Sequence, residues 1–284
     1  MIQVQQLVYR YPGTREPVLH GLDFDIQPGE IFGFLGPSGA GKSTVQRIIL
    51  GLLKDYDGSV QVLGQEMRQF TSKGYEQIGA AFEFPNFYSR FTAMENLSLF
   101  SKLYRSGTIP EVELLERAGL ADAANVRVER FSKGMKMRLN FCRAVMHQPR
   151  LLLLDEPTSG LDPANTKMMM DWIKELSVQG TAVMITTHNM HVADALCDRV
   201  AFMMGGRLPL IDSPRRLKLS HGAKRVAVEY EDGGNMRRRE FPLNGIGHHS
   251  EFLQLLRNQE IETIHTMETT LEDIFMEVTG RDLA

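Results

Sequence analysis

Two stretches near the start of the chain, residues 2–8 and 22–26, alternate between apolar and polar positions, as strands with one buried face do. A fully apolar run at 31–35 breaks the alternation, and a glycine-rich loop follows it. After the loop, Val45, Ile48, Ile49 and Leu52 recur at helical spacing, which predicts a helix that begins at about Gly41. Polar turns are expected at 28–30 and 54–58, and strands at 2–8, 22–26, 31–35 and 59–64.

The middle of the chain has a helical pattern. Thr92 and Glu95 have the spacing of a capping box, Pro110 is expected at the first position of a second helix, and Ser132 is placed to cap a third that runs to about Met146. A strand at 78–82 and an aromatic loop precede these helices. We therefore expect a helical insert over about residues 90–148.

Strands and helices alternate again up to Gly205-Gly206. The run of four leucines at 151–154 is typical of a parallel strand covered on both faces. Alternation of this kind predicts a mostly parallel sheet with helices packed on its faces. The further elements expected here are a helix opened by Asp162-Pro163 and ending near Val178, a strand at 181–186, a helix at 189–196 and a strand at 199–204.

The composition shifts after Ser213-Pro214. A hairpin is predicted from residues 224–231 and 237–243 around 232–235, followed by a helix at 250–257, a strand at 261–267 and a helix at 271–278. The fold class is therefore α/β, with an antiparallel N-terminal part and a helical insert. Residues 1–213 form the main domain in this interpretation, and 214–284 form a small α+β accessory domain.

Composition and charge narrow the possible functions. The chain has 284 residues, 43% hydrophobic and 24% charged, and a net charge of −3, which gives no case for nucleic acid binding. Arg237-Arg238-Arg239 beside Glu240 is more typical of a solvated strand. Cys142 and Cys197 suggest neither a disulfide framework nor a metal site, which fits a reducing cytosol. We find no bilayer-spanning apolar run and no signal peptide, so any membrane role is expected to depend on partners.

The glycine-rich loop carries the first chemical signal. It reads GPSGAGKST and matches the pattern G-x-x-x-x-G-K-[ST] of a phosphate-binding P-loop. Such a loop aims backbone N–H groups at phosphates, and the following helix adds the positive end of its dipole. Lys42 is expected to reach the β- and γ-phosphates, and Ser43 to bind Mg²⁺. The predicted phosphate-binding residues are Gly36, Pro37, Ser38, Gly39, Ala40, Gly41, Lys42, Ser43 and Thr44.

Two acids form the second signal. Asp155 and Glu156 follow the leucine strand, where the P-loop of a neighbouring parallel strand is also expected to open. Asp155 would hold Mg²⁺, directly or through water, and Glu156 would orient and polarise the attacking water. On its own the pair could simply be two solvated acids, but the P-loop earlier in the chain favours a nucleotide-hydrolysing site.

Three further segments follow the P-loop in this order: Phe131-Ser132-Lys133-Gly134-Met135, Ser159-Gly160-Leu161-Asp162, and His188 directly after a strand. Together with the P-loop and the acids, they resemble the nucleotide-binding subunit of an ATP-binding cassette (ABC) transporter over residues 1 to about 213. Each has a simpler interpretation alone: a helix cap for Ser132 and Asp162, and a loop histidine for His188.

The resemblance implies specific roles. Two subunits would sandwich two ATP molecules head to tail, each site joining the P-loop of one chain to the 131–135 segment of the other. Tyr11 would stack on adenine, although Tyr9 competes for that position, and His188 would contact the γ-phosphate. Ser132, Lys133 and Gly134 would bind the γ-phosphate across the interface, and Asp162 would couple the two sites.

The sequence departs from the family pattern at two places. The usual LSGGQ is FSKGM here, with Lys133 replacing a glycine and Met135 a glutamine. The hydroxyl of Ser132 is retained and Lys133 adds positive charge, so phosphate binding should survive. Glu83 occupies the position of a glutamine that senses Mg²⁺ and the lytic water. A carboxylate can bind the metal but repels the γ-phosphate, so we expect altered rather than absent hydrolysis.

We call residues 131–135 (FSKGM) the signature. The chain resembles the ATPases of ABC-2 type exporters of drugs and antibiotics and of self-immunity systems in three features: this variant signature, the EFPNFY loop and the tail at 271–275. This implies a cytoplasmic subunit, peripheral on the inner face of the cell membrane, that powers export of a small molecule, drug or peptide. Its partners would be a separate transmembrane permease and a second ATPase subunit, identical or different. The loop at 84–88 would dock on the permease, unless its aromatic side chains form a small hydrophobic cluster packed inside this chain.

Two other functions compete. The first is an ABC-type ATPase that acts on ribosomes or DNA, but those proteins carry two cassettes or long coiled-coil inserts, and this chain has one P-loop and no heptad run. The second is an unrelated P-loop kinase or GTPase, which gives no reason for the series Ser132, Asp162 and His188.

Overall fold

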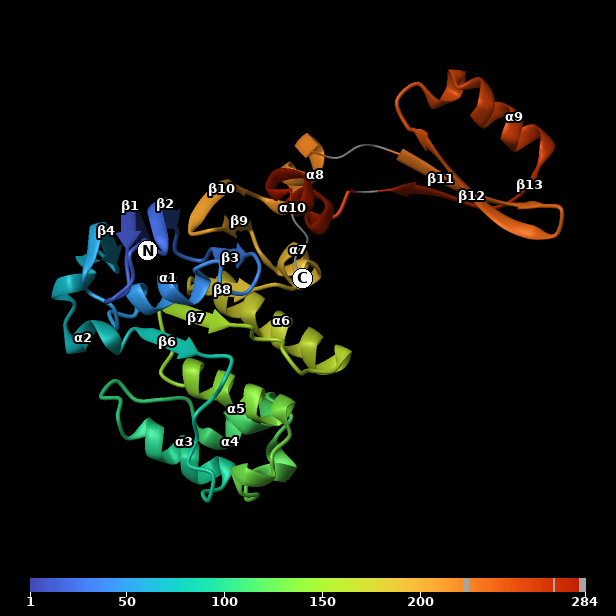
Figure 1. Cartoon of the computed structure of the whole chain (residues 1–284). Helices are drawn as coiled ribbons and strands as arrows, with labels where there is room; N and C mark the ends of the chain where they lie inside the picture. The colour runs from blue at the N-terminus through green and yellow to red at the C-terminus, as the bar shows by residue number, and fades with distance from the viewer. Residues whose placement is uncertain (222–224, 268, 281–284) are drawn as a thin grey trace. The chain divides into compact units, whose positions relative to one another are not determined.

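The computed structural model describes residues 1–221, 225–267 and 269–280, and divides into two compact units (Figure 1). The first runs from Met1 to Asp212, and the second begins at Ser213. Among the described residues, no helix has the length and apolar character needed to cross a membrane.

A four-stranded antiparallel sheet opens the first unit, in the order β2-β1-β4-β5. Its inward residues are fully buried while their neighbours face solvent, as the alternation predicts. Two strands begin three residues before their predicted starts: β2 at Leu19 rather than at residue 22, and β4 at Tyr56 rather than at residue 59. Tyr56, expected in a polar turn, belongs to the strand because it pairs with Tyr9 and buries its ring. The strands are β1 (Ile2–Tyr9), β2 (Leu19–Ile26), β4 (Tyr56–Val62) and β5 (Gln65–Glu66).

A six-stranded sheet forms the centre of the first unit, in the order β10-β9-β3-β8-β7-β6. β3, β6, β7, β8 and β9 are parallel, whereas β10 pairs antiparallel with β9 beyond Gly205-Gly206, where the sequence predicted no strand. The strands are β3 (Ile31–Leu35), β6 (Ile78–Ala81), β7 (Leu151–Asp155), β8 (Ala182–Thr187), β9 (Arg199–Met204) and β10 (Arg207–Asp212).

The strand order corrects one expectation. β3, which feeds the P-loop, and β7, which ends in the acids, are not neighbours, because β8 pairs with both. The carboxyl end of β8 therefore lies between the P-loop and the acids. Since ligands of parallel α/β sheets bind beyond the carboxyl ends of the strands, all three strands contribute to one edge.

Helix α1 (Lys42–Ile49) is buried between the two sheets. Val45, Ile48 and Ile49 are fully buried, and they share one core cluster with residues of both sheets, such as Val60 of β4 and Phe34 of β3. This burial holds the P-loop in place from the helix side. α6 (Pro163–Val178) packs on β8, and α7 (Met190–Leu196) packs on β3. The short α2 (Ser72–Tyr75) precedes β6.

The helical insert lies beside the edge strand β6 and is drawn in green in Figure 1. It contains α3 (Ala93–Ser101), α4 (Glu111–Arg117) and α5 (Lys133–Val145). Thr92 and Glu95 form a complete capping box, and Ser132 caps α5. Pro110 lies at the N-cap of α4 rather than at its first helical position. Short 3₁₀ turns occur at η1 (Met67–Gln69), η2 (Ala121–Ala123) and η3 (Val128–Arg130).

The second unit is a three-stranded antiparallel sheet, in the order β12-β11-β13, with one helix packed on it. The hairpin turn is tighter than predicted, because only Gly233 and Gly234, both with positive φ, separate the paired strands. Lys224, predicted as the start of the hairpin, lies outside the described residues. The elements are α8 (Pro214–His221), which was not predicted, β11 (Arg225–Asp232), β12 (Asn235–Pro242), η4 (Ile246–His248), α9 (Ser250–Asn258), β13 (Glu260–Met267) and α10 (Leu271–Thr279).

Candidate functional site

The loop at 36–44 joins β3 to α1 at the carboxyl edge of the central sheet. Gly36 touches the neighbouring strand so closely that a Cβ there would lie 2.2 Å from the carbonyl oxygen of Met203. Gly41 caps α1 with φ of 115°, which side chains rarely adopt. The Lys42 ammonium folds back over the loop and donates to the carbonyls of Gly36 at 2.6 Å and Pro37 at 2.9 Å. The backbone and the lysine thus enclose a space suited to an anion.

The two acids are held by residues at the end of β8. The Thr186 hydroxyl donates to Asp155 Oδ1, and the Thr187 hydroxyl donates to Glu156 Oε2 at 2.9 Å. Glu156 Oε1 accepts from the backbone amide of His188 at 2.9 Å and lies 2.7 Å from its Nδ1. Glu156 has φ of 47°, a conformation that few non-glycine residues adopt. Its carboxylate is therefore fixed at both oxygens.

Lys42, Asp155, Glu156 and His188 line one cavity of about 610 Å³. Glu83, just beyond β6, enters the same cavity, and so does Tyr11, whose hydroxyl lies 3.2 Å from Thr44 Oγ1. Tyr9 is 3% exposed and packs in the core, so Tyr11 is the one of the two that reaches the cavity. The lining residues are Tyr11, Val18, Ser38, Gly39, Gly41, Lys42, Ser43, Thr44, Glu83, Asp155, Glu156 and His188.

Burial sets the electrostatics of the cavity. It lowers the pKa of Lys42, although the nearby carboxylates of Glu156 and Asp155 oppose this. It also raises the pKa of Asp155, against the effect of the hydrogen bond from Thr186. Both charged forms are thus poorly solvated here, so that a phosphate chain near Lys42 and a cation near Asp155 would each relieve an electrostatic cost.

The cavity offers oxygen atoms of the kind that Mg²⁺ binds. The Ser43 hydroxyl and the carboxylates of Asp155 and Glu83 line it together. Among the described residues, no group of three or more His, Cys, Asp or Glu side chains could hold a metal alone. This donor set fits Mg²⁺, which usually combines one or two carboxylates with water and substrate phosphates.

The segment at 132–134 lies outside this cavity. Ser132 is exposed and its hydroxyl accepts from the Met135 amide at 3.2 Å. The Lys133 ammonium donates to Ser159 Oγ at 2.9 Å, and a Cβ on Gly134 would lie 2.9 Å from the carbonyl oxygen of Gly160. The segment therefore packs against the turn at 159–162 of its own chain, a contact that the sequence did not predict.

Asp162 also lies away from the cavity. It caps α6, and its carboxylate accepts from the Asn165 amide at 2.9 Å. This hydrogen bond is the main cause that holds the pKa of Asp162 below its usual value. Within one chain, neither Asp162 nor the 132–134 segment lines the cavity at the P-loop.

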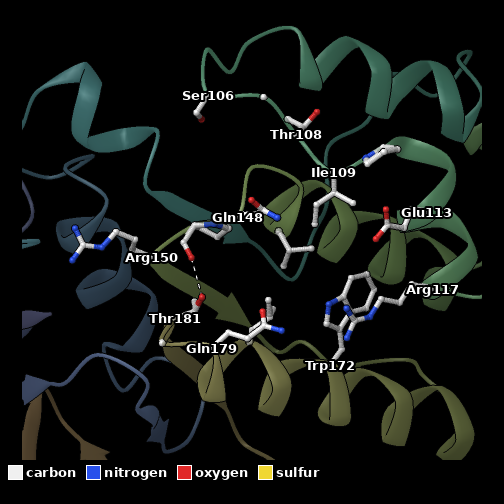
Figure 2. A pocket seen from close by; sticks show the side chains of 16 residues that line it. Ser106, Thr108, Ile109, Glu113, Arg117, Gln148, Arg150, Trp172, Gln179 and Thr181 are labelled. Atoms are coloured by element: carbon white, nitrogen blue, oxygen red, sulfur yellow. Dashed lines mark hydrogen bonds between the residues drawn. The ribbon is translucent and has the colours of Figure 1, made fainter.

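A further cavity of about 750 Å³ lies between the helical insert and α6 (Figure 2). Arg117 stacks over the ring of Trp172 there, with 4.3 Å from its guanidinium carbon to the ring centroid, and pairs with Glu175. Arg150 and Thr181 line it immediately before β7 and β8 begin. The cavity is thus at the amino ends of these strands, the opposite edge from the P-loop, so it is not the predicted nucleotide site.

Known proteins with similar sequences connect this geometry to a family. A family model described as "ABC transporter" matches residues 19–159. The fluoroquinolones export ATP-binding protein of Mycobacterium tuberculosis (strain ATCC 25618 / H37Rv) is 47% identical over 284 residues, covering 100% of this chain and 94% of that protein. The chain belongs to the ABC transporter family. It is an ATP-binding subunit of that family, and its activity is ATP hydrolysis.

Other relatives agree with this ABC assignment. The Nod factor export ATP-binding protein I of Rhizobium meliloti is 33% identical, over 94% of this chain and 85% of its own. A dimeric ATP-binding cassette in a post-hydrolysis state, bound to ADP and Pi, is similar over 75% of this chain and 98% of its own, with 26% identity and a TM-score of 0.67. A second family model, "Fluoroquinolone efflux ABC transporter C-terminal domain", matches residues 224–268.

The sequence-based interpretation of this ABC subunit overlooked Thr186 and Thr187. Both are fully buried; Thr186 bonds Asp155, the last residue of β7, and Thr187 bonds Glu156, the residue after it. Their signal was available: two hydroxyl residues at the polar end of an otherwise apolar strand, next to His188. Without the strand order, however, nothing indicated that β8 would lie beside β7.

Proposed function

We propose that the cavity at the P-loop binds Mg·ATP and that its hydrolysis drives export through a separate membrane subunit. The observation that carries this proposal is the convergence of Lys42, Asp155, Glu156 and His188 on one cavity. Residues 1–213 would be the ATPase domain, with a helical subdomain at about 90–148, and 214–284 an accessory domain. We place the subunit in the cytoplasm, on the inner face of the cell membrane.

Each cavity residue has a proposed task. Tyr11 would stack on adenine, the P-loop amides and Lys42 would bind the phosphates, and Ser43, Asp155 and Glu83 would hold Mg²⁺. The ion, when bound, would neutralise charge on the phosphates. Glu156 would accept the proton of the attacking water. The fixed carboxylate supports this, because a base must be oriented before it can act. His188 uses Nδ1 for Glu156, which leaves Nε2 for the γ-phosphate.

A second copy of the chain would complete each site. Ser132 to Gly134 do not line the P-loop cavity of their own chain, which supports a head-to-tail pair in which they reach the γ-phosphate of the partner. Ser132 is exposed at the N-terminus of a 13-residue helix, a geometry suited to an anion. Asp162 would couple the two sites. We propose a homodimer as the assembly.

The loop after β6 is the proposed contact with the permease. Phe84 is 77% exposed, Tyr88 55% and Phe91 42%, so these rings do not form a hydrophobic cluster packed inside the chain. Exposed aromatic residues that lie close together in sequence are typical of protein interfaces. From the names of the relatives, we propose fluoroquinolone-like small molecules as the exported class.

Steady-state ATPase activity and size-exclusion chromatography test the proposed hydrolysis. Glu156→Gln should abolish turnover and accumulate an ATP-dependent dimer. Glu175→Gln is the matched control, since Glu175 is a glutamate on the surface of α6 that pairs with Arg117. If Glu156→Gln kept the wild-type rate and neither protein dimerised, a phosphotransferase with another acceptor would be the better hypothesis.

Growth of the native host tests the proposed export. Replacing Glu156 by Gln in the chromosomal gene should lower the fluoroquinolone concentration that stops growth, and Glu175→Gln should leave it unchanged. Equal fluoroquinolone tolerance of the Glu156→Gln and Glu175→Gln strains would exclude fluoroquinolones as the exported class. The proposal of ATP hydrolysis would not be affected by that result.

A further inference from the structure

Helix α5 and the loop that follows β6 are joined by a buried polar contact. We propose that Asn140 and Arg143 of α5 form a latch that makes residues 82–91, here called the docking loop, move as one body with α5. The proposal rests on the proposed function, in which α5 begins at the signature residues and the docking loop carries Glu83 and the exposed aromatics.

Asn140 fixes the start of the docking loop. Its side chain is fully buried, and its Nδ2 donates to the carbonyl of Phe82 at 2.8 Å. Its Oδ1 accepts from Arg143 Nη2 at 2.6 Å. Glu83, the residue after Phe82, enters the nucleotide cavity. The position of Glu83 therefore depends on a side chain of α5.

Arg143 holds the middle of the loop. Its Nη1 donates to the carbonyl of Asn86 at 2.9 Å, and its guanidinium lies 4.8 Å from the ring centroid of Phe87 and 5.0 Å from that of Phe100. Burial lowers its pKa, and among the described residues no carboxylate pairs with it. A desolvated cation without a counter-ion is costly, so its contacts with the loop and the two rings must compensate.

The far end of the loop is held in the same way. Asn96 of α3 is fully buried; its Oδ1 accepts from the Tyr88 amide at 3.0 Å, and its Nδ2 donates to the Tyr88 carbonyl at 3.1 Å. The amides of Glu129 and Val128 donate to the carbonyls of Ser89 at 2.9 Å and Phe91 at 3.0 Å. A segment with this many backbone contacts does not open alone at low cost.

The latch connects two places that ATP would affect. Ser132 caps α5, and Asn140 follows eight residues later, about 12 Å along the helix. Any shift of the signature end of α5 would therefore carry the docking loop with it. The loop has Glu83 in the cavity at one end and exposed Phe84 and Tyr88 on its outer side. The latch would thus transmit the nucleotide state to the permease surface.

Hydrogen–deuterium exchange of the full chain tests the latch. Without nucleotide, Arg143→Met should speed amide exchange in 82–91 by about tenfold or more, and Arg143→Lys should restore part of the protection. Arg138→Met is the matched control: Arg138 lies on the same helix and donates to the carbonyls of Ala118 at 2.6 Å and Gly119 at 2.9 Å. It should loosen that turn and leave 82–91 unchanged.

ATP added in a Glu156→Gln background should protect residues 36–44 in every variant. ATP should also alter amide exchange in 82–91 of the Glu156→Gln parent, which has no second substitution, and of the parent with Arg138→Met. It should not alter exchange in 82–91 of the parent with Arg143→Met. In chains with Glu156, Arg143→Met should lower kcat about fivefold with KM for ATP within about twofold, whereas Arg138→Met should retain kcat.

Wild-type exchange and an intact ATP response in 82–91 of Arg143→Met would overturn the latch. If Arg143→Met did not fold, Asn140→Ala and Arg143→Lys would decide by the same criteria. If ATP did not change amide exchange at 36–44 of the Glu156→Gln parent, the proposed function would be refuted instead. The comparison of amide exchange in 82–91 without nucleotide would still decide whether the latch exists.

Discussion

The substitution Thr187→Val tests how the chain fixes Glu156. Valine has nearly the shape of threonine, and the side chain is fully buried, so the change removes the hydroxyl with little loss of packing. Two hydrogen bonds disappear: the donation to Glu156 Oε2 at 2.9 Å and the acceptance from the Asn189 amide at 3.0 Å. A hydrogen bond to a charged group contributes about 1.5–3 kcal/mol, and an unsatisfied amide costs about 1–3 kcal/mol.

Because the two contacts share one hydroxyl, their losses should not add fully. We expect the free energy of unfolding to fall by about 2–4 kcal/mol. With Oε2 released, the Glu156 carboxylate can rotate away from the position where it would meet the lytic water. A misplacement of about 1 Å costs about 10²-fold in rate, so kcat should fall about 10- to 100-fold. KM for ATP should stay within about twofold, since Thr187 does not line the cavity.

Denaturant unfolding and steady-state ATPase assays measure the two effects separately. Thr181→Val is the matched control, because Thr181 lies just before the other end of β8 and its hydroxyl donates to the carbonyl of Pro149 at 3.0 Å. It should lose stability with little loss of kcat. Equal kcat values for the two variants at equal stability loss would refute the idea that Thr187 positions Glu156 for catalysis.

Three other predictions concern the cavity. Gly36→Ala should destabilise the fold by about 3 kcal/mol or more in denaturant unfolding, because its Cβ would lie 2.2 Å from the carbonyl oxygen of Met203. Gly39→Ala, with open space around it but φ of 77°, should cost only about 1–2 kcal/mol, and equal losses would contradict the clash. Glu83→Gln should change both turnover and its dependence on Mg²⁺ concentration, and unchanged values would remove Glu83 from the metal site. Tyr11→Ala should raise KM for ATP about tenfold in the ATPase assay, through the loss of about 1–2 kcal/mol of ring contact; an unchanged KM would exclude adenine stacking.

Local patterns in the sequence predicted most of the elements. The period of apolar residues and the caps predicted α3, α5 and α6 with ends close to those observed, because these signals act within a few residues. The P-loop was recognised for the same reason: nine consecutive residues contain its glycines, its lysine and its hydroxyls. The C-terminal hairpin was predicted from its glycine turn, although the turn is shorter than expected.

Long-range pairing was not available from these patterns. Tyr56 looked like part of a turn, and only its pairing with β1 makes it a strand residue. The choice between Tyr9 and Tyr11 depended on which ring the core buries. β10 follows two glycines that looked like an end, and it forms because the edge of β9 offers unpaired backbone groups.

The sequence by itself determined which chemical groups the chain carries and in what order: the P-loop, the two acids, the signature and His188. Only the tertiary structure decided which of them meet. The insertion of β8 between β3 and β7 places Thr187 and His188 on Glu156. The signature lies outside the P-loop cavity of its own chain, where Lys133 donates to Ser159. Strand order and side-chain contacts depend on burial summed over segments far apart in the chain, which no local pattern records.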